Sequence, residues 1–320
     1  MMPQVTIIIP NYNGLAYLET CLASLKKQTM TDFKILIVDN GSTDGSLSWL
    51  REHCREAEVL ALDKNYGFCA AVNKGIRASD TPYVILLNND TEAEPEFVEA
   101  LLSEIGKSDW IFSCQAKMMD FKNRQLMDDA GDYYCALGWA FARGKGKNQR
   151  HYTKERPIFA ACAGAAIYRR SILDEIGCFD EEHFAYLEDI DIGYRAKIYG
   201  YYSLFVPRAR IYHMGSATTG SQYNKLKVRL SARNSIYTAY KNMPLLQLIL
   251  NMPLILSGIL LKSLFFVKKH LGKEFCAGIF QGIKLCKKEK KVKYQRKHLK
   301  NYMKIQLELW KNIGVRFIKI

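Results

Sequence analysis

The chain has 320 residues, of which 48% are hydrophobic and 24% charged, a composition that is ordinary for a folded protein and excludes a wholly disordered one. Its formal net charge of +14 is unevenly placed, because residues 241–320 hold 18 lysines and arginines against 3 acids, while the preceding residues hold 28 against 29. Nine scattered cysteines without a CxxC pair argue against a disulfide framework or a zinc site and favour a reducing compartment.

The chain begins with a strand and a helix. Residues 5–9 are apolar without alternation, as in a strand buried on both faces, and they end at the polar segment Pro10-Asn-Tyr-Asn-Gly14. Residues 15–27 then carry leucines at helical spacing. Because residues 1–10 lack a basic region and soon become polar, we expect a strand here and not a signal peptide, and therefore a cytoplasmic protein.

The same unit of strand, polar loop and helix repeats four times within residues 5–105. Strands are expected at residues 5–9, 33–38, 59–62 and 83–87, and helices at residues 15–27, around Leu47 and Leu50, and at residues 69–78 and 96–105. This alternation predicts an α/β fold with a doubly wound, mostly parallel sheet. Ligands of such sheets bind outside the carboxyl ends of the strands.

The alternation stops after a fifth expected strand at residues 110–118. Residues 119–157 are rich in glycine, tyrosine and charge, and insertions of this length often shape a second substrate site. An apolar segment around Gly164 follows, and then residues 184–195, the start of a helix rich in carboxylates. A further strand is expected at residues 201–206.

Polar side chains follow two of the predicted strands. Asn88, Asn89 and Asp90 could hold a hard divalent cation that carries a diphosphate, although an acid after an apolar strand is also an ordinary strand-loop junction. Asp39 could accept the imino N–H of a pyrimidine whose ring Tyr12 covers, or it could cap the next helix.

Three acids stand within four residues at Glu188, Asp189 and Asp191. The helix dipole favours acids at a helix start, which is a structural explanation, but the apolar neighbours would half-bury them and raise a carboxyl pKa toward that of a working base. Arg195 is spaced to pair with one acid, which would leave another free to act. His213 becomes a metal candidate only if the fold brings it beside Asp90.

Taken together, these segments resemble a known family. They are Pro10-Asn-Tyr-Asn-Gly14, Val38-Asp-Asn-Gly-Ser-Thr-Asp-Gly-Ser46, Asn65-Tyr-Gly-Phe68 with Asn73, Leu86-Leu-Asn-Asn-Asp90, and Tyr186-Leu-Glu-Asp-Ile-Asp-Ile-Gly-Tyr-Arg195 followed by His213. In this order they resemble the inverting family 2 glycosyltransferases of GT-A fold, and within them the bacterial rhamnosyltransferase-like members. The resemblance covers roughly residues 4–240.

The resemblance implies roles for these residues. It implies a nucleotide-sugar donor site at Pro10, Tyr12, Asn13, Asp39, Asn65, Gly67, Asn73, Asn88 and Asn89, a metal site at Asp90 and His213, a catalytic base at Asp189, and acceptor-side support from Gly164, Glu188, Asp191 and Arg195. The metal would be Mg²⁺ or Mn²⁺. Asn88 replaces the first aspartate of the Asp-x-Asp motif of many relatives, so we expect a weakened cation site.

The resemblance also implies a division of the chain and a reaction. Residues 1–118 would be the nucleotide-sugar-binding half and residues 119–240 the acceptor and catalytic half of a GT-A domain. The donor would be dTDP-rhamnose or a UDP-sugar. The acceptor would be a hydroxyl of a glycan or lipid-linked glycan in cell-surface polysaccharide synthesis.

The basic last quarter, residues 241–320, is expected to be a helical extension that binds a membrane or forms oligomers. Residues 243–261 contain no charged side chain, which is just long enough for a membrane span, but Pro244, Pro253 and two amides predict a poor single helix. An apolar stretch of this kind should be buried, whether at a membrane interface, against the core, in a homodimer or across the bilayer. The lysines of residues 284–304 would then meet anionic headgroups on the inner face of the cell membrane.

Two other functions compete with this interpretation. A nucleotidyltransferase should have a glycine-rich basic loop after its first strand, and residues 10–14 are not of that kind. A non-catalytic protein could use the basic extension to bind membrane or nucleic acid. The extension is dominated by lysine without an aromatic or arginine-rich surface for reading bases, so we expect no nucleic-acid partner.

Overall fold

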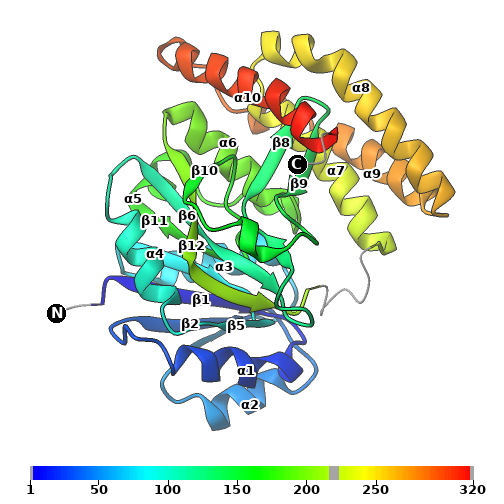
Figure 1. Cartoon of the computed structure of the whole chain (residues 1–320). Coiled ribbons are helices and arrows are strands. Elements are labelled where there is room, and N and C mark those ends of the chain that lie inside the picture. Colours follow the sequence, from blue (N-terminus) through cyan, green and yellow to red (C-terminus); the bar gives the residue numbers. More distant parts are fainter. Residues whose placement is uncertain (1–2, 216–222, 318–320) are drawn as a thin grey trace.

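Four parallel strands from the first ninety residues form one side of the central sheet (Figure 1). The computed structural model describes residues 3–215 and 223–317. The strands are β1 (Val5–Asn11), β2 (Lys34–Asp39), β3 (Glu58–Ala61) and β4 (Tyr83–Leu87), and they lie side by side in the order β4, β1, β2, β3. The helices α1 (Leu15–Leu25), α2 (Ser46–His53), α3 (Phe68–Ala78) and α4 (Phe97–Ile105) alternate with them. The predicted doubly wound, mostly parallel sheet is confirmed.

The second half of the sheet is mixed. Its path runs β10 (Arg156–Ile158), β12 (Tyr202–His213), β6 (Ile111–Asp120) and β11 (Ala165–Arg169), and β11 joins β4. β11 runs antiparallel to both of its neighbours, whereas β12 is parallel to β6. Three short strands come from the loops: β5 (Thr91–Ala93) pairs with β12, β7 (Met127–Asp129) pairs with β6, and β8 (Asp132–Cys135) forms a hairpin with β9 (Trp139–Ala142). β12 extends beyond the predicted residue 206 because it pairs with β6 and β5 as far as His213.

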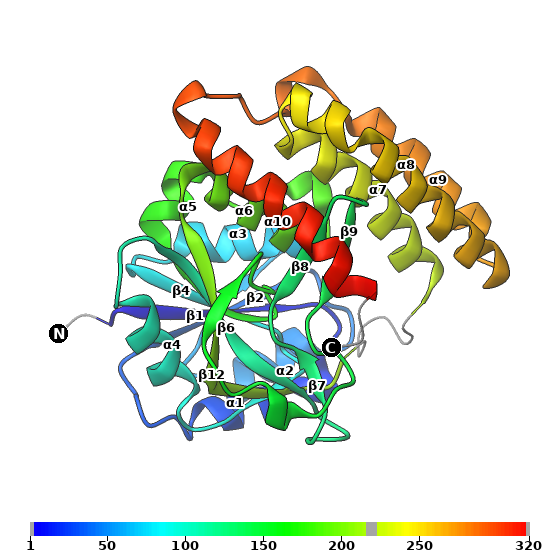
Figure 2. The ribbon, with the colours of Figure 1, turned by 45° about the horizontal axis from the view of Figure 1, so that its top comes forward.

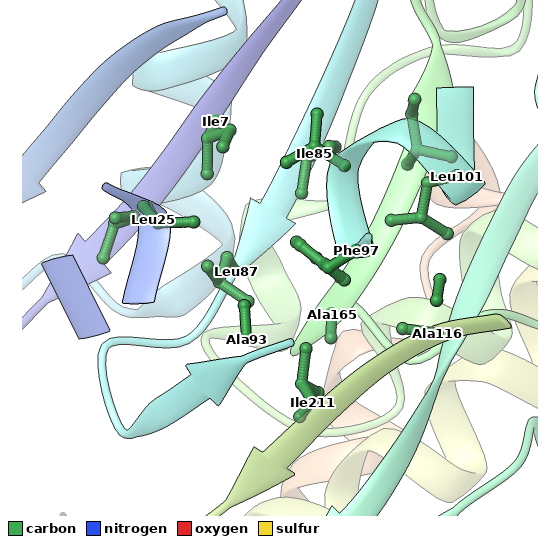
Figure 3. Close-up of a cluster of buried hydrophobic side chains, with 14 of the residues drawn as sticks. Ile7, Leu25, Ile85, Leu87, Ala93, Phe97, Leu101, Ala116, Ala165 and Ile211 are labelled. Atoms are coloured by element: carbon green, nitrogen blue, oxygen red, sulfur yellow. The ribbon is translucent and has the colours of Figure 1, made fainter. Parts of the chain in front are cut away.

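Helices cover both faces of the sheet, which explains why its strands are apolar without alternation. Ile7 and Ile9 of β1 point to the face covered by α1, α2 and α4, and Figure 3 shows Ile7, Ile85 and Phe97 in that core. Ile8 points to the opposite face, beneath α3, α5 (Arg170–Ile176) and α6 (Glu188–Tyr199). Side chains of a strand alternate between faces, so each face receives every second residue.

The C-terminal helices begin before the expected residue 241, and the name extension is used from here on for all four longer ones, α7 (Lys225–Asn242), α8 (Leu245–Lys268), α9 (Gly272–Leu285) and α10 (Leu299–Phe317). α7 and α9 are in backbone contact, because a Cβ added at Gly278 would lie 2.3 Å from the carbonyl oxygen of Arg229. α10 packs on α6 and β8 through Tyr302 and Leu309. Short 3₁₀ turns complete the chain at Gln149–His151, Glu181–His183, Lys288–Lys290 and Arg296–His298. The division of the chain at residue 240 stays a prediction.

α8 differs from its prediction in two respects. It is one continuous helix of 24 residues despite Pro253, so the expectation of a poor single helix is wrong. Proline removes one backbone hydrogen bond, but its ring lies on the exposed side of α8, and contacts of the opposite side with the rest of the protein hold the helix together. Of the places expected to bury this stretch, the core of the chain is not the one found, because 17% of the most apolar window of α8 is buried. By length and composition alone, α8 could cross a membrane.

Candidate active site

The carboxyl ends of β1, β2 and β4 meet at one edge of the sheet, where amide and carboxylate side chains are joined in a chain. Asn11 lies opposite Asp39 in the β1–β2 register and donates to its Oδ2 at 2.8 Å. Asn89 follows β4 and donates to Oδ1 of Asn11 at 2.6 Å. Gly14 allows this approach, since a Cβ at residue 14 would lie 2.0 Å from Nδ2 of Asn89. Asp39, which is buried, is thereby fixed below the loops.

The loops above this edge carry most of the remaining predicted donor residues. Pro10 near the end of β1 and Tyr12 in the loop after it are partly exposed, and Asn13 of that loop accepts a hydrogen bond from the backbone N–H of Thr43 at 2.7 Å. In the loop after β3, Asn65 accepts from the backbone N–H of Gly67 at 2.8 Å. These residues surround one side of the edge, and their role in donor binding stays a prediction.

Asn73 has a different position from the other predicted donor residues. Its side chain donates to the carbonyl of Phe179 at 2.7 Å and accepts from the backbone N–H of the same residue at 3.1 Å. Asn73 therefore joins α3 to the segment that precedes α6.

The fold brings His213 beside Asp90. The pairing of β12 with β5 places His213 opposite Thr91, and its Nε2 lies 3.2 Å from Oδ1 of Asp90. Its Nδ1 lies 2.8 Å from Oδ2 of Asp128, and Nδ2 of Asn88 lies 3.5 Å from its Nε2. A carboxylate oxygen and an imidazole nitrogen suit a divalent transition-metal ion such as Mn²⁺. Asp128 adds the outer carboxylate that usually orients a metal-binding histidine.

The charges around His213 favour a cation between these side chains. Burial alone would lower the pKa of His213, but hydrogen bonds to Asp128 and Asp90 raise it to about 10. Burial likewise opposes the charge of Asp128, and His213 and Lys145 hold its pKa below the usual range. Because a metal ion binds the neutral imidazole, a cation at this position competes with a proton for Nε2.

The segment before α6 is held in a strained conformation. Phe184, Tyr186 and Leu187 have φ angles of 60°, 72° and 64°, which residues other than glycine rarely adopt. Asn234 of α7 lies against this segment, with its Nδ2 2.7 Å from the carbonyl of Tyr186 and 3.0 Å from that of His183. The first helix of the extension therefore fixes the position of the acids that follow.

Asp191 is the structural acid of the three on α6. It is fully buried, and its carboxylate accepts from Arg195 at 2.9 Å, from Lys241 at 2.9 Å and from Asn242 at 2.8 Å. Burial alone would raise the pKa of Asp191, but Lys241 and Arg195 hold it well below its usual range. A carboxylate with these partners is not available as a base.

Glu188 and Asp189 have no such cations. Glu188 is buried, its Oε2 has no hydrogen-bond partner among the described residues, and burial raises its pKa to about 8. Asp189 is partly exposed, it accepts from the backbone N–H of Ile190 at 2.7 Å, and its carboxyl group lies beside that of Asp132. Burial raises the pKa of both carboxyl groups, and burial and nearby acids raise that of Asp132 well above its ordinary value, so a shared proton is held by Asp132. Asp189 therefore remains a carboxylate that is accessible and can accept a proton.

Three acids from the insertion at residues 119–157 enter the site without having been predicted. Successive side chains of β7 alternate, so Asp128 faces His213, while Asp129 faces Asp132, with ligand atoms of Asp129, Asp132 and Cys162 within 4.8 Å of one another. Burial, and next the charge of Asp128, raise the pKa of Asp129 to about 7. The signal in the sequence was a pair of adjacent acids within a polar insertion. The roles of Lys241 and Asn234 had no comparable signal.

Gly164 lies at the border of the two groups of side chains, where its carbonyl accepts from the backbone N–H of Asn88 at 2.9 Å. β7 lies between the Asp90–His213 pair and the Asp132–Asp189 pair, and contributes an acid to each. The arrangement therefore combines a candidate cation site and a candidate general base along one connected surface.

Known proteins of similar sequence and fold bear on this arrangement. The family described as "Glycosyl transferase family 2" matches residues 6–177. The N-acetylglucosaminyl-diphospho-decaprenol L-rhamnosyltransferase of Mycobacterium tuberculosis is 27% identical over 247 residues, which cover 69% of this chain and 79% of that protein.

Two solved structures share the fold. GalNAc-T7, solved with UDP, GalNAc and Mn²⁺, has a TM-score of 0.61 at 17% identity and covers 74% of this chain, which spans 48% of the GalNAc-T7 chain. The mannosyltransferase PcManGT of Pyrobaculum calidifontis, solved with GDP-Man and Mn²⁺, has a TM-score of 0.55 at 13% identity and covers 88% of each chain. At these identities the likeness concerns the fold, which is of the GT-A type with a C-terminal helical extension.

Proposed function

Because the chain belongs to glycosyl transferase family 2, we propose that it is a metal-assisted, inverting glycosyltransferase that extends a glycan or lipid-linked glycan in cell-surface polysaccharide synthesis. The observation that carries this proposal is the pairing of an accessible Asp189 with Asp132, separated by β7 from the Asp90–His213 pair. Family membership does not support a nucleotidyltransferase or a non-catalytic binding protein.

The donor is a nucleoside diphosphate sugar, with dTDP-rhamnose or a UDP-sugar as the proposed choice. Asp39 is fixed by Asn11 and lies beneath a loop that carries Tyr12, an arrangement suited to holding a base edge under an aromatic ring. The rhamnosyltransferase of M. tuberculosis supports a rhamnose donor and a lipid-linked acceptor. An acceptor of that kind would bring this protein to the cytoplasmic face of the cell membrane.

The chemistry follows from the two side-chain pairs. Asp189 takes the proton of the acceptor hydroxyl as its oxygen attacks the anomeric carbon from the face opposite the diphosphate. One displacement inverts that carbon, so no nucleophilic side chain is required. Asp90 and His213 would hold Mg²⁺ or Mn²⁺, which supplies charge neutralisation for the departing diphosphate. General-base assistance of this type is worth about 10² to 10⁴ in rate.

A thermal-shift panel tests the proposal. The full-length protein is heated with dTDP, UDP, GDP and their sugars, each with Mn²⁺, with Mg²⁺ and with a chelator. We expect one pyrimidine nucleotide to raise Tm with a metal ion and to lose that effect with the chelator, because binding to the folded state alone stabilises it. Absence of a shift with every nucleotide would contradict the proposed donor site.

A further inference from the structure

We propose that α8, together with the outer side of α10, seats this protein on an anionic lipid bilayer, with α8 lying in the plane of the membrane and not across it. The proposal goes beyond sugar transfer and concerns the outer surface of the C-terminal helices. Figures 1 and 2 show α8 and α10 on the side of the molecule away from α1 and α2.

The side of α8 that faces the protein carries polar and small residues. Gln247 accepts a hydrogen bond from the hydroxyl of Tyr194 at 2.8 Å, and Asn251 exchanges hydrogen bonds of 2.8 Å with Gln306 of α10. Further along, Gly258 lets α8 approach the β8–β9 hairpin, since a Cβ there would lie 2.3 Å from the carbonyl oxygen of Leu137. Gln247 and Asn251, the two amides that argue against a membrane-spanning helix in the sequence, therefore make buried contacts with the rest of the protein.

The opposite side of α8 is apolar and exposed. Seven of its apolar side chains are between 57% and 79% exposed, namely Leu245, Leu246, Ile249, Leu256, Leu260, Leu264 and Val267. Among residues 245–267, all of which the structure describes, Ser257 is the one exposed polar side chain. This distribution is the reverse of that of a helix on a water-soluble surface. Continuous apolar surface of this size marks a contact with a protein or a membrane.

α10 continues the apolar surface. Met303, Leu307 and Trp310 are exposed at helical spacing, and Trp310 also donates to Oδ1 of Asn251 at 3.3 Å. Two helices from different parts of the chain thus present apolar residues beside one another. A surface made by two packed helices suits an extended plane such as a bilayer.

The contacts of α8 along its length exclude a spanning orientation. Gln247 near its start binds α6, the carbonyl of Gly258 accepts from Nε1 of Trp139 at 3.2 Å, and Phe266 near its end stacks on Phe275 of α9. At 1.5 Å per residue, the 24 residues of α8 cover about 36 Å, and protein lies along that whole length. A helix bound on one side by a polar domain cannot have lipid on all sides, so it lies in the interface.

Charge identifies the occupant of this surface. Residues 241–320 carry 18 lysines and arginines against 3 acids, and two of those acids are engaged, Glu274 with Arg229 and Glu308 with Lys197. Lys300 and Lys304 are exposed next to the apolar side chain of Met303. Two copies of so basic a surface would repel each other, whereas anionic headgroups attract it. The surface therefore fits anionic lipid better than a second copy of this chain.

Vesicle sedimentation tests the surface. The full-length protein is mixed with vesicles of phosphatidylcholine alone or with added phosphatidylglycerol, and bound protein is measured in the pellet. We expect the protein to bind the anionic vesicles. For Leu256→Glu combined with Leu260→Glu we expect the affinity to fall by about tenfold or more, because each substitution removes an apolar side chain that the lipid would bury. Leu226→Glu is the matched control, since Leu226 and Leu256 are both 57% exposed. Circular dichroism confirms that the variants are folded.

A second measurement distinguishes lying in the membrane from crossing it. We expect alkaline carbonate to release the bound protein, and lipids brominated near the headgroups to quench Trp310 more than lipids brominated near the bilayer centre. Resistance to carbonate extraction would overturn the in-plane orientation. Equal vesicle binding by the wild type and the double variant, or no vesicle binding at all, would overturn the whole proposal.

The result is independent of the proposed function. A wild-type protein that does not bind vesicles but keeps its nucleotide-induced Tm shift would refute the membrane surface and leave the transferase unaffected. The surface would instead serve self-association if light scattering shows that the wild type is a dimer and the double variant a monomer, and if the wild type does not bind lipid. That result would contradict the proposal.

Discussion

Glu188, Asp189 and Asp191 are close in sequence but differ in their surroundings. Asp191 is surrounded by cations and an amide, Glu188 is buried with an oxygen that has no hydrogen-bond partner among the described residues, and Asp189 is partly exposed beside a carboxyl group. A carboxylate acts as a base only when it is accessible and is not already neutralised by partners. The surroundings therefore suit Asp189 to the role of catalytic base, whereas Asp191 has a structural role.

The first prediction concerns Asp189. Asp189→Asn keeps the shape of the side chain but removes its basicity, so we expect turnover to fall by about 10² to 10⁴ while donor affinity stays within about twofold. Transfer rates and nucleotide affinity measured on the same preparation check this. Asp174→Asn, on the exposed side of α5, is the control. Turnover near that of the wild type in Asp189→Asn would refute the assignment.

The second prediction concerns Asp128, which orients His213 but lies behind it relative to Asp90. Removing an outer carboxylate of this kind typically lowers metal affinity by about 10- to 100-fold. We expect such a loss for Mn²⁺ in Asp128→Asn, measured by titration calorimetry in the presence of nucleotide. Unchanged Mn²⁺ affinity would show that His213 is not a ligand.

At the scale of elements, α7 holds the strained segment that leads into α6. Three consecutive or nearly consecutive residues with positive φ are stable only where their surroundings fix them. Asn234 does so from one side, and Gly67 contributes from the other, since a Cβ at Gly67 would lie 2.5 Å from the ring of Phe184. The loop after β3 and the helix of the extension thus meet at the entrance to the catalytic acids.

The third prediction follows from this arrangement. Asn234→Ala leaves buried carbonyls without their donor, which costs about 1–3 kcal/mol. We expect a lower Tm and a fall in kcat that exceeds any change in KM for the donor, because the segment before Asp189 loosens while the donor loops do not. Ser231→Ala on the same helix is the control. A kcat equal to that of the wild type would mean that α7 does not position the acids.

Local sequence patterns predicted β1 to β4 and the residues at their ends, because an apolar strand followed by a polar loop is specified within about ten residues. They did not predict that Asp128 and Asp132 join the site, since those positions depend on the pairing of β7 with β6 and on a hairpin that is far from α6 in the sequence. For α8, the pattern predicted an apolar stretch but neither its continuity as one helix nor its orientation. Gln247 and Asn251 indicate that orientation only once Tyr194 and Gln306 lie beside them.

At the scale of the whole molecule, the catalytic domain and the extension share buried polar contacts. Asp180, before α6, accepts from Lys241 of α7 at 2.7 Å, and His183 lies 3.0 Å from the hydroxyl of Thr238. α10 adds apolar contacts through Tyr302 and Leu309. Removal of the extension would therefore expose the core of the acceptor side, so substitutions on the surface of α8 test its role better than truncation does.

The fourth prediction is a dependence of stability on pH. Burial lowers the pKa of His183 from 6.5 to about 4. Between these values the unfolded chain binds more protons than the folded one, so the contribution of His183 is present above pH 6.5 and is lost as the pH falls toward 4, by up to about 3 kcal/mol. We expect His183→Gln to flatten this part of the profile of unfolding free energy against pH. Parallel profiles for both proteins between pH 4 and 6.5 would contradict the assignment.

The hydrogen bond between Tyr194 and Gln247 joins the helix that begins with the catalytic acids to the helix that faces the lipid. Packed helices lie about 8–10 Å apart, so the reacting end of α6 is held at a low, fixed height above the headgroups. The end of a short saccharide can reach the catalytic acids of α6 while its lipid anchor remains in the bilayer. The end of a long polymer lies farther from the bilayer than these acids. We therefore expect short lipid-linked acceptors to be extended in preference to long ones, measured as transfer rates on acceptors of graded length.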